Sequence, residues 1–227
     1  MSNIDKNSLI GLGPNSKKIK KYKDTLSALT PMQKEAAIGL TLGDASLNTD
    51  NGGKTYRMKF EWGDRQKAYV DHVFSLFDQW VLSPPHKKVR ISPKGNEIIT
   101  WGFQTLSHKA FNPLAELFLI NNIKTIPNFL ILNHLTPIGL AYWFCDDGGK
   151  LDYNKNSQNK SIVLNTQSFT EIEVNKLADE LIKKFNFDCE VRSNKGKKVI
   201  VIKAVSYILF RELIDPYIIS EMRYKLP

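Results

Sequence analysis

The sequence has little cysteine and no long uninterrupted apolar segment. Its two cysteines, Cys145 and Cys189, form no Cys-x-x-Cys pair among 227 residues. We therefore expect no disulfide framework and no structural zinc site, and a reducing compartment fits this composition. The longest apolar stretches, residues 111–120 and 199–210, are too short or too interrupted by charge to span a bilayer, which needs about 20 residues. The N-terminus lacks the apolar region of a secretory signal, so we expect an intracellular protein.

Several familiar catalytic patterns are also missing. The four histidines have no metal-ligand spacing, and each is better interpreted as a solvated or core residue. The sequence contains no Ser-His-Asp elbow, no Walker loop and no Gly-x-Gly-x-x-Gly fingerprint. These absences argue against histidine-based metal sites, acyl transfer by a serine triad and nucleotide-dependent chemistry.

Positive charge is what the chain has in excess. It carries 32 basic and 23 acidic side chains, a net charge of +9, with 42% hydrophobic residues. This composition is typical of a globular protein with a polyanionic partner, nucleic acid first and an anionic membrane second. The basic residues are 26 lysines and 6 arginines, beside 18 asparagines. Such a bias is typical of AT-rich coding and hints at an organellar gene.

The chain repeats itself once. Thr30-Pro31 begins an apolar stretch that ends at Asp44, and Thr136-Pro137 begins another that ends at Asp147, 103 residues after Asp44. Threonine at the N-cap and proline at the first position are strong signals for the start of a helix. The second of these helices is expected to be shorter by about one turn.

The remaining elements recur in the same order in both halves. Residues 55–62 alternate strictly between apolar and polar, which predicts a half-buried strand, and Thr170 with Glu173 forms a capping box. Each half reads helix, two strands, helix, two strands, helix. The other predicted elements are strand 161–167, helices around 70–80 and 174–185, hairpins 87–92/98–104 and 189–192/199–204, and helices 112–120 and 206–214. The predicted divisions are a basic arm at 1–28 and halves at 29–130 and 131–227.

Acidic residues stand where the two first helices end. A helix C-terminus carries partial negative charge and favours Lys or Arg, yet these ends carry Asp44, Asp146 and Asp147. Small residues on the first helix, such as Gly39 and Gly43, would let a second helix approach. If the two helices pack in parallel, the carboxylates converge and need a cation between them, for which Mg²⁺ is suited. The alternative is that each aspartate caps the following loop.

Residues 37–45 (AIGLTLGDA) and 140–148 (LAYWFCDDG) resemble the two motifs of single-chain LAGLIDADG homing endonucleases. The resemblance covers nearly the whole chain. It implies an α+β fold of two pseudo-symmetric αββαββα halves, each a saddle-shaped antiparallel sheet, packed through two parallel motif helices. Two positions depart from the motif: Tyr142 replaces the usual interface glycine, and Asp146 replaces the usual alanine.

The resemblance also implies a function. A member of this family would be a monomeric, site-specific endonuclease that cleaves double-stranded DNA at a long asymmetric target for intron homing, leaving short 3′ overhangs. Asp44 and Asp147 would hold Mg²⁺, with Mn²⁺ able to substitute, beside the scissile phosphates. Lys124 and Lys225 match basic residues near those phosphates and are expected to be catalytic. An intron-encoded protein would act in mitochondria or another organelle, with no membrane partner. Whether Asp146 also binds metal stays open.

The polar faces of the predicted strands are expected to meet DNA. Arg and Lys suit guanine edges, and Asn and Gln suit adenine. Alternation places Lys88 and Arg90 on one face of their strand, and Thr100, Gly102 and Gln104 on another. The predicted DNA-binding residues are Lys17, Lys18, Lys20, Arg57, Lys59, Glu61, Lys88, Arg90, Asn165, Gln167, Arg192, Lys195, Lys197, Lys198 and Lys203.

Two other functions remain possible at this point. An RNA maturase that assists the splicing of a group I intron would share the fold and the basic surface. A non-catalytic DNA-binding regulator would share them too, but is expected to have lost the acids. Retention of both Asp44 and Asp147 favours the endonuclease.

Overall fold

The structure is a computed structural model that describes residues 4–13, 15–154 and 156–227. Residues 1–3 and Pro14 of the predicted basic arm lie outside the described residues. Contacts divide the chain into two compact units. Unit 1 comprises residues 1–33 and 45–115, and unit 2 comprises residues 34–44 and 116–227. This division assigns most of the first motif helix to the same unit as the second.

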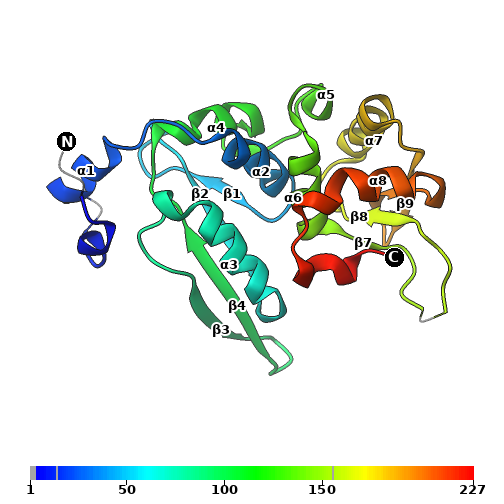
Figure 1. Cartoon of the computed structure of the whole chain (residues 1–227), viewed down its shortest axis with the longest axis horizontal. Helices are drawn as coiled ribbons and strands as arrows, with labels where there is room; N and C mark the ends of the chain where they lie inside the picture. The colour runs from blue at the N-terminus through cyan, green and yellow to red at the C-terminus, as the bar shows by residue number, and fades with distance from the viewer. Residues whose placement is uncertain (1–3, 14, 155) are drawn as a thin grey trace. The chain divides into compact units, whose positions relative to one another are not determined.

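Unit 1 is built on a four-stranded antiparallel sheet (Figure 1). Its strands run in the order β1 (Ser46–Asn48), β2 (Arg57–Gly63), β4 (Glu97–Gln104) and β3 (His86–Ile91). The predicted alternation is confirmed, because Met58, Phe60 and Trp62 are buried while Lys59 is exposed. Helix α3 (Lys67–Leu76) packs on β2 and β4, so the polar side of β2 faces away from it.

The N-terminal arm is docked on unit 1 through a small core of its own. A 3₁₀ turn (Lys6–Leu9) and helix α1 (Lys17–Lys23, capped by Ser16) bury Leu9, Ile19 and Tyr22. The hydroxyl of Tyr22 donates to the carbonyl of Gln79 at 2.7 Å. Lys17, Lys18 and Lys20 remain exposed on the other side of α1.

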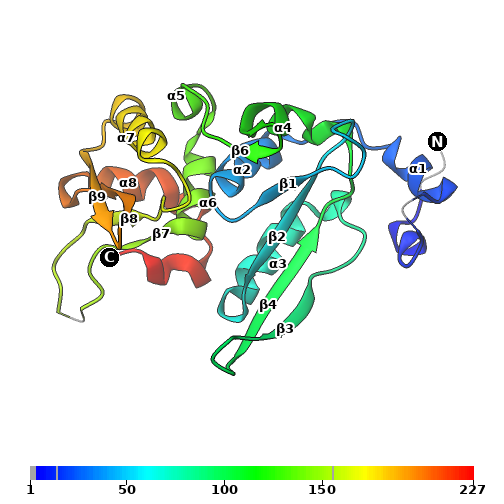
Figure 2. The same ribbon diagram turned by 180° about the vertical axis from the view of Figure 1, so that it is seen from behind.

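Unit 2 contains the second sheet, ordered β7 (Gly148–Lys150), β8 (Ile162–Leu164), β10 (Lys197–Ile202) and β9 (Cys189–Asn194) (Figure 2). This is the same antiparallel order as in unit 1, with each strand at the equivalent place in the chain. Helix α7 (Glu171–Phe185) packs on β9 and β10 and begins with the predicted capping box. The predicted fold class is confirmed by this repeated topology.

Unit 2 also holds the two motif helices and several short connecting elements. The motif helices are α2 (Pro31–Leu42), of which residues 34–42 belong to unit 2, and α6 (Pro137–Asp147). The remaining elements are α4 (Asn112–Phe118), which continues from unit 1, β5 (Leu119–Ile120), β6 (Ile123–Lys124), α5 (Leu130–His134) and α8 (Tyr207–Ile214).

The prediction that the second motif helix is one turn shorter was wrong. Helix α2 has 12 residues and α6 has 11. The difference lies in where each helix ends: α2 stops at Leu42, two residues before Asp44, whereas α6 continues through Asp147. The sequence pattern also failed to locate β1 and β7, which have only three residues each and follow the motif helices almost directly.

Candidate active site and nucleic-acid interface

Helices α2 and α6 lie in parallel and in close contact along their length within unit 2. Near the start, the hydroxyl of Thr136 donates to Glu35 at 2.6 Å. In the middle, a Cβ added to Gly39 would lie 1.9 Å from the carbonyl oxygen of Gly139. Near the end, a Cβ added to Gly43 would lie 2.4 Å from the Cβ of Asp146. The three contacts follow the same order in both helices, so their C-termini lie together.

The second glycine of this contact is one that sequence reasoning missed. The motif alignment placed Tyr142 opposite Gly39 and left close packing in doubt. The structure uses Gly139 instead, one position before the second motif, and Tyr142 is buried with 2% of its surface exposed. Gly139 was visible in the sequence as a small residue in the first turn after Thr136-Pro137. Tyr142 therefore does not prevent close packing.

Asp146 connects the two motif helices. Its side chain is buried, and Oδ2 accepts a hydrogen bond from the backbone N–H of Asp44 at 3.0 Å. The space for this carboxylate exists because residue 43 is glycine. Gly43 and Asp146 occupy the same position in the two motifs, and the small residue in one helix makes room for the larger one in the other. The carboxylate of Asp146 therefore ties the end of α6 to the backbone at the end of α2.

A lysine from a distant segment caps the C-terminus of each motif helix. Nζ of Lys124, at the end of β6, donates to the carbonyls of Leu42 at 3.4 Å and Gly43 at 3.0 Å. Nζ of Lys225, in the 3₁₀ turn Ser220–Lys225, donates to the carbonyls of Cys145 at 2.5 Å and Asp146 at 2.9 Å. These lysines supply the positive charge that a helix C-terminus favours and that the helices themselves lack.

The charges at the paired helix ends strongly affect one another. Burial, together with the negative charge of Asp44, raises the pKa of Asp147 to about 7. Lys124 and Lys225 oppose this rise. Burial lowers the pKa of both lysines, while the nearby aspartates act to raise it. Three carboxylates, those of Asp44, Asp146 and Asp147, and two ammonium groups are therefore brought together at one place.

The donor set fits a hard divalent cation. Carboxylate oxygens are preferred ligands of Mg²⁺, and a cation beside Asp44 and Asp147 would relieve the repulsion that raises the pKa of Asp147. Among the residues that the structure describes, no three His, Cys, Asp or Glu side chains gather closely enough to form a complete protein cage. Mg²⁺ commonly keeps waters and phosphate oxygens among its ligands, so an incomplete cage suits it.

On the unit 1 sheet, the predicted DNA-binding residues share one face. Lys59 and Glu61 stand on β2, and the strand register pairs Lys88 with Thr100 and Arg90 with Ile98. The prediction that Thr100, Gly102 and Gln104 lie on a different face from Lys88 was wrong, because cross-strand partners always point to the same side. The polar face is therefore wider than the alternation of one strand suggested.

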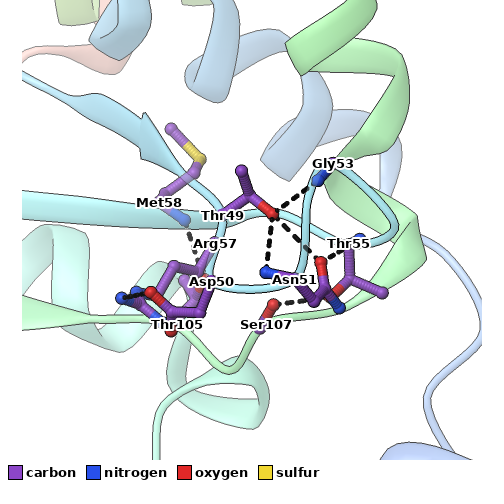
Figure 3. Close-up of polar contacts among 9 residues, drawn as sticks. All are labelled: Thr49, Asp50, Asn51, Gly53, Thr55, Arg57, Met58, Thr105 and Ser107. Atoms are coloured by element: carbon purple, nitrogen blue, oxygen red, sulfur yellow. Dashed lines mark hydrogen bonds and ion pairs between the residues drawn. The ribbon is translucent and has the colours of Figure 1, made fainter. Parts of the chain in front are cut away.

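Arg57 is held by the loop that joins β1 and β2 (Figure 3). Its guanidinium forms a two-pronged ion pair with Asp50, with Nη2 at 2.8 Å from Oδ1. The loop itself is cross-linked, since Thr55 donates its N–H to Asn51 at 3.0 Å and lies 2.7 Å from the hydroxyl of Ser107. Arg57 is thus a fixed cation at the start of β2.

On the unit 2 sheet, only part of the predicted set comes together. A groove of about 500 Å³ is lined by Asn165 and Arg192, with Val163 and Val199 among its lining residues. Asn165 also donates to the carbonyl of Asp147 at 2.8 Å and accepts from Gln167 at 3.2 Å, which ties this strand end to α6.

The four predicted lysines of this hairpin do not form one cluster. Lys197 shares the parity of Val199 and Arg192 on the groove side, and Lys195 occupies the turn. Lys198 has the opposite parity and pairs with Glu171 of α7 at 3.0 Å, and Lys203 pairs with Asp188 at 3.0 Å. Sequence alternation could have separated Lys198 from Lys197, but the cluster of basic residues obscured it.

Residues 34–210 match the family model described as the LAGLIDADG DNA endonuclease family. The chain belongs to the LAGLIDADG DNA endonuclease family. Its first motif helix, second motif helix and both sheets fall within or directly beside the matched range. Endonucleases of this family depend on divalent metal ions. Within the described residues, no helix has the length and apolar character needed to cross a membrane.

Individual relatives agree with the family assignment. The chain is 47% identical to a probable intron-encoded endonuclease 1 of Wickerhamomyces canadensis, across 98% of this chain and 96% of the relative. It is 31% identical to the cytochrome b mRNA maturase bI2 of Debaryomyces hansenii, across 91% and 79%. Among solved structures, it matches the homing endonuclease I-WcaI bound to its DNA recognition sequence, with a TM-score of 0.95, 46% identity and 99% coverage of both chains.

These LAGLIDADG relatives confirm the expected endonuclease family and weaken the maturase alternative. The endonuclease relative is more similar to this chain than the maturase relative over comparable lengths. The first relative is named as intron-encoded and the second as a maturase of cytochrome b mRNA, and both names agree with the organellar hint from lysine and asparagine usage.

Proposed function

We propose that this chain is an intron-encoded endonuclease that cuts both strands of a long, asymmetric DNA site and leaves short 3′ overhangs. The observation that carries the proposal is the convergence of Asp44 and Asp147 at the ends of two parallel helices, each capped by a lysine. Carboxylates that converge repel one another unless a cation lies between them. Such charged clusters are typical of functional sites.

Asp44 and Asp147 are the proposed ligands of Mg²⁺, for which Mn²⁺ can substitute. An ion held by these two carboxylates would supply activation of a water molecule and stabilisation of the leaving oxygen in phosphodiester hydrolysis. Asp146 is not a ligand in this proposal, because its carboxylate is buried and occupied by the N–H of Asp44. Lys124 and Lys225 place ammonium groups at the same helix ends, where they can stabilise negative charge that develops on a phosphate.

Double-stranded DNA is the proposed partner of a single copy of this chain, in a mitochondrion or another organelle. The division into an arm (1–28) and two halves (29–130 and 131–227) is retained as part of the proposal. Each half offers one sheet face with basic and amide side chains to a half-site, with Arg57 and Lys59 on the first and Arg192 and Asn165 on the second. The exposed lysines of α1 add contacts to the DNA backbone.

The deciding experiment replaces each acid with its amide. We expect Asp44→Asn or Asp147→Asn to reduce double-strand cleavage by a factor of at least about 1,000, while binding to the target persists. Target sites are first selected as cleaved products from a random duplex library with Mg²⁺. Asp71→Asn, an exposed substitution on α3, is the charge-matched control. Normal cleavage by either active-site variant would refute the assignment.

The maturase function has one observation in its favour, the similarity to the bI2 maturase of Debaryomyces hansenii. Affinity for intron RNA, compared with affinity for the DNA of the insertion site, separates the two functions. A preference for RNA, with cleavage absent, would support the maturase instead.

A further inference from the structure

One acidic side chain stands in the middle of the basic sheet face of unit 1. Glu61 on β2 accepts hydrogen bonds from Nζ of Lys88 at 2.6 Å and from Nη2 of Arg90 at 3.2 Å. The hydroxyl of Thr100 donates to the same carboxylate at 2.9 Å. One carboxylate therefore holds two cations and a hydroxyl contributed by two other strands.

This arrangement depends on how the sheet is ordered. Strand β4 lies between β2 and β3, and neighbouring strands are about 4.8 Å apart, so Glu61 must reach across β4 to meet Lys88 and Arg90. The residue directly opposite Glu61 on β4 is Gly102, which has no side chain to block the path. A Cβ at Gly102 would lie 3.5 Å from the Cβ of Glu61. The sheet is thus built to let this carboxylate cross it.

Stability alone does not account for this network. Ion pairs with this degree of exposure contribute little to stability, because water screens them and two long side chains must be ordered. The hydrogen bond from Lys88 lowers the pKa of Glu61, so the carboxylate is ionised at neutral pH. What the network does achieve is order, because it fixes two long cationic side chains that otherwise sample many rotamers.

We propose that Glu61 is a positioning residue that holds Lys88 and Arg90 for guanine edges, so that this cluster reads adjacent G·C base pairs in the major groove. Arg and Lys that are aimed at guanine O6 and N7 give the commonest specific contact to DNA. The carboxylate also offsets one of the two positive charges, which reduces attraction to phosphates of any sequence. Glu61 therefore increases discrimination rather than total affinity. This inference rests on the proposed function.

The test compares the sequence preference of four proteins: the native chain, Glu61→Gln, Arg90→Gln and the control Asp71→Asn. Asp71→Asn removes the same charge from an ion pair with Lys67 on α3, which packs on the other side of the sheet.

Bound duplexes are selected from a randomised library without divalent ions, and affinities are then measured for single base-pair changes. We expect Glu61→Gln to lose about tenfold of the discrimination at the G·C pairs that Arg90→Gln also affects. Its low-salt affinity should be kept or raised, with a steeper salt dependence, and Asp71→Asn should keep the native preference.

Three outcomes would overturn the inference. These are an unchanged preference in Glu61→Gln, a loss at base pairs different from those of Arg90→Gln, or an equal loss of affinity for every duplex by a folded variant. If the native chain itself selects no DNA sequence, the proposed function is wrong, and the inference is not what failed.

Circular dichroism melting shows whether each variant is folded. If Glu61→Gln does not fold, Thr100→Val removes one hydrogen bond from Glu61 at nearly constant volume. A smaller loss at the same pairs would then support the inference, and no loss would overturn it.

Discussion

At the residue scale, the structure moves the pKa of Asp147 into the neutral pH range. Its pKa of about 7 results first from burial and then from the negative charge of Asp44, with Lys124 and Lys225 opposing both. A carboxyl group that is half protonated near neutral pH can hold a metal ion only after it loses its proton. Both the affinity for metal and the stability of the metal-free protein should therefore depend on pH.

The first measurement is metal binding. We expect affinity for Mn²⁺, followed by isothermal calorimetry, to fall steeply as pH drops below about 7, because protons compete for Asp147. Asp44→Asn should move this fall to lower pH, since it removes a charge that raises the pKa of Asp147.

A lysine variant provides the opposite test. Lys124→Met removes a cation that lowers the pKa of Asp147, so the fall should move to higher pH. Lys183→Met, at an exposed position of α7, is the control. If the pH at which Mn²⁺ affinity falls is the same in Asp44→Asn, Lys124→Met and the native chain, this account of the site is wrong.

The second measurement is stability without metal. The folded pKa of Asp147 is raised from 3.8 to about 7, so its contribution to stability is full below pH 3.8 and is lost as pH rises through 7. At pH 8 the ionised carboxylate therefore destabilises the fold, and Asp147→Asn should raise the melting temperature by about 2–4 °C per kcal/mol relieved. The gain should vanish near pH 4. An equal or lower melting temperature at pH 8 would contradict the electrostatic interpretation.

At the scale of elements, the contact between α2 and α6 decides the geometry of the site. Gly39→Ala gains about 1 kcal/mol of helix propensity. The added Cβ would lie 1.9 Å from the carbonyl of Gly139, far inside contact distance, so the helices must separate. We expect a net loss of about 1–3 kcal/mol in urea unfolding. Gly13→Ala, where an added Cβ meets nothing within 4 Å, should leave stability nearly unchanged. Equal stability of the two variants would refute the close contact.

Helix α7 also positions the segment that leads into the second motif. The carboxylate of Glu180 accepts hydrogen bonds from the backbone N–H of Phe129 at 2.7 Å and of Ile131 at 2.7 Å, and Nζ of Lys184 donates to the carbonyl of Ile131 at 2.8 Å. One face of α7 thereby provides hydrogen-bond partners for backbone N–H and carbonyl groups at both ends of the short helix α5. Helical periodicity in the sequence did not reveal α5.

At the scale of the whole molecule, net charge governs how the chain meets DNA. With a charge of +9 and exposed lysines on α1, we expect the binding constant to fall linearly with salt on a logarithmic plot. Contact with six to ten phosphates would cost about a thousandfold or more between 50 and 200 mM salt. Fluorescence anisotropy with the target duplex measures this slope. A loss of less than about tenfold would show that few phosphates are contacted.

The sequence by itself determined the features that depend on neighbouring residues. Thr-Pro pairs mark both motif helices, alternation marks β2, and Thr170 with Glu173 caps α7, because each signal arises from hydrogen bonds or side-chain periodicity within a few positions. Repetition of these signals was enough to predict two halves with acidic residues at both helix ends, and the resemblance to the LAGLIDADG motif then selected Asp147 over Asp146.

Only the tertiary structure decided which distant residues meet. Gly139 opposite Gly39, Asp146 against the N–H of Asp44, and the lysine caps of both helices join positions 79 to 102 residues apart. The bond between Glu61 and Lys88 crosses a whole strand. Such contacts depend on strand order, register and the space left by glycine, and these are properties of packing that no local pattern encodes.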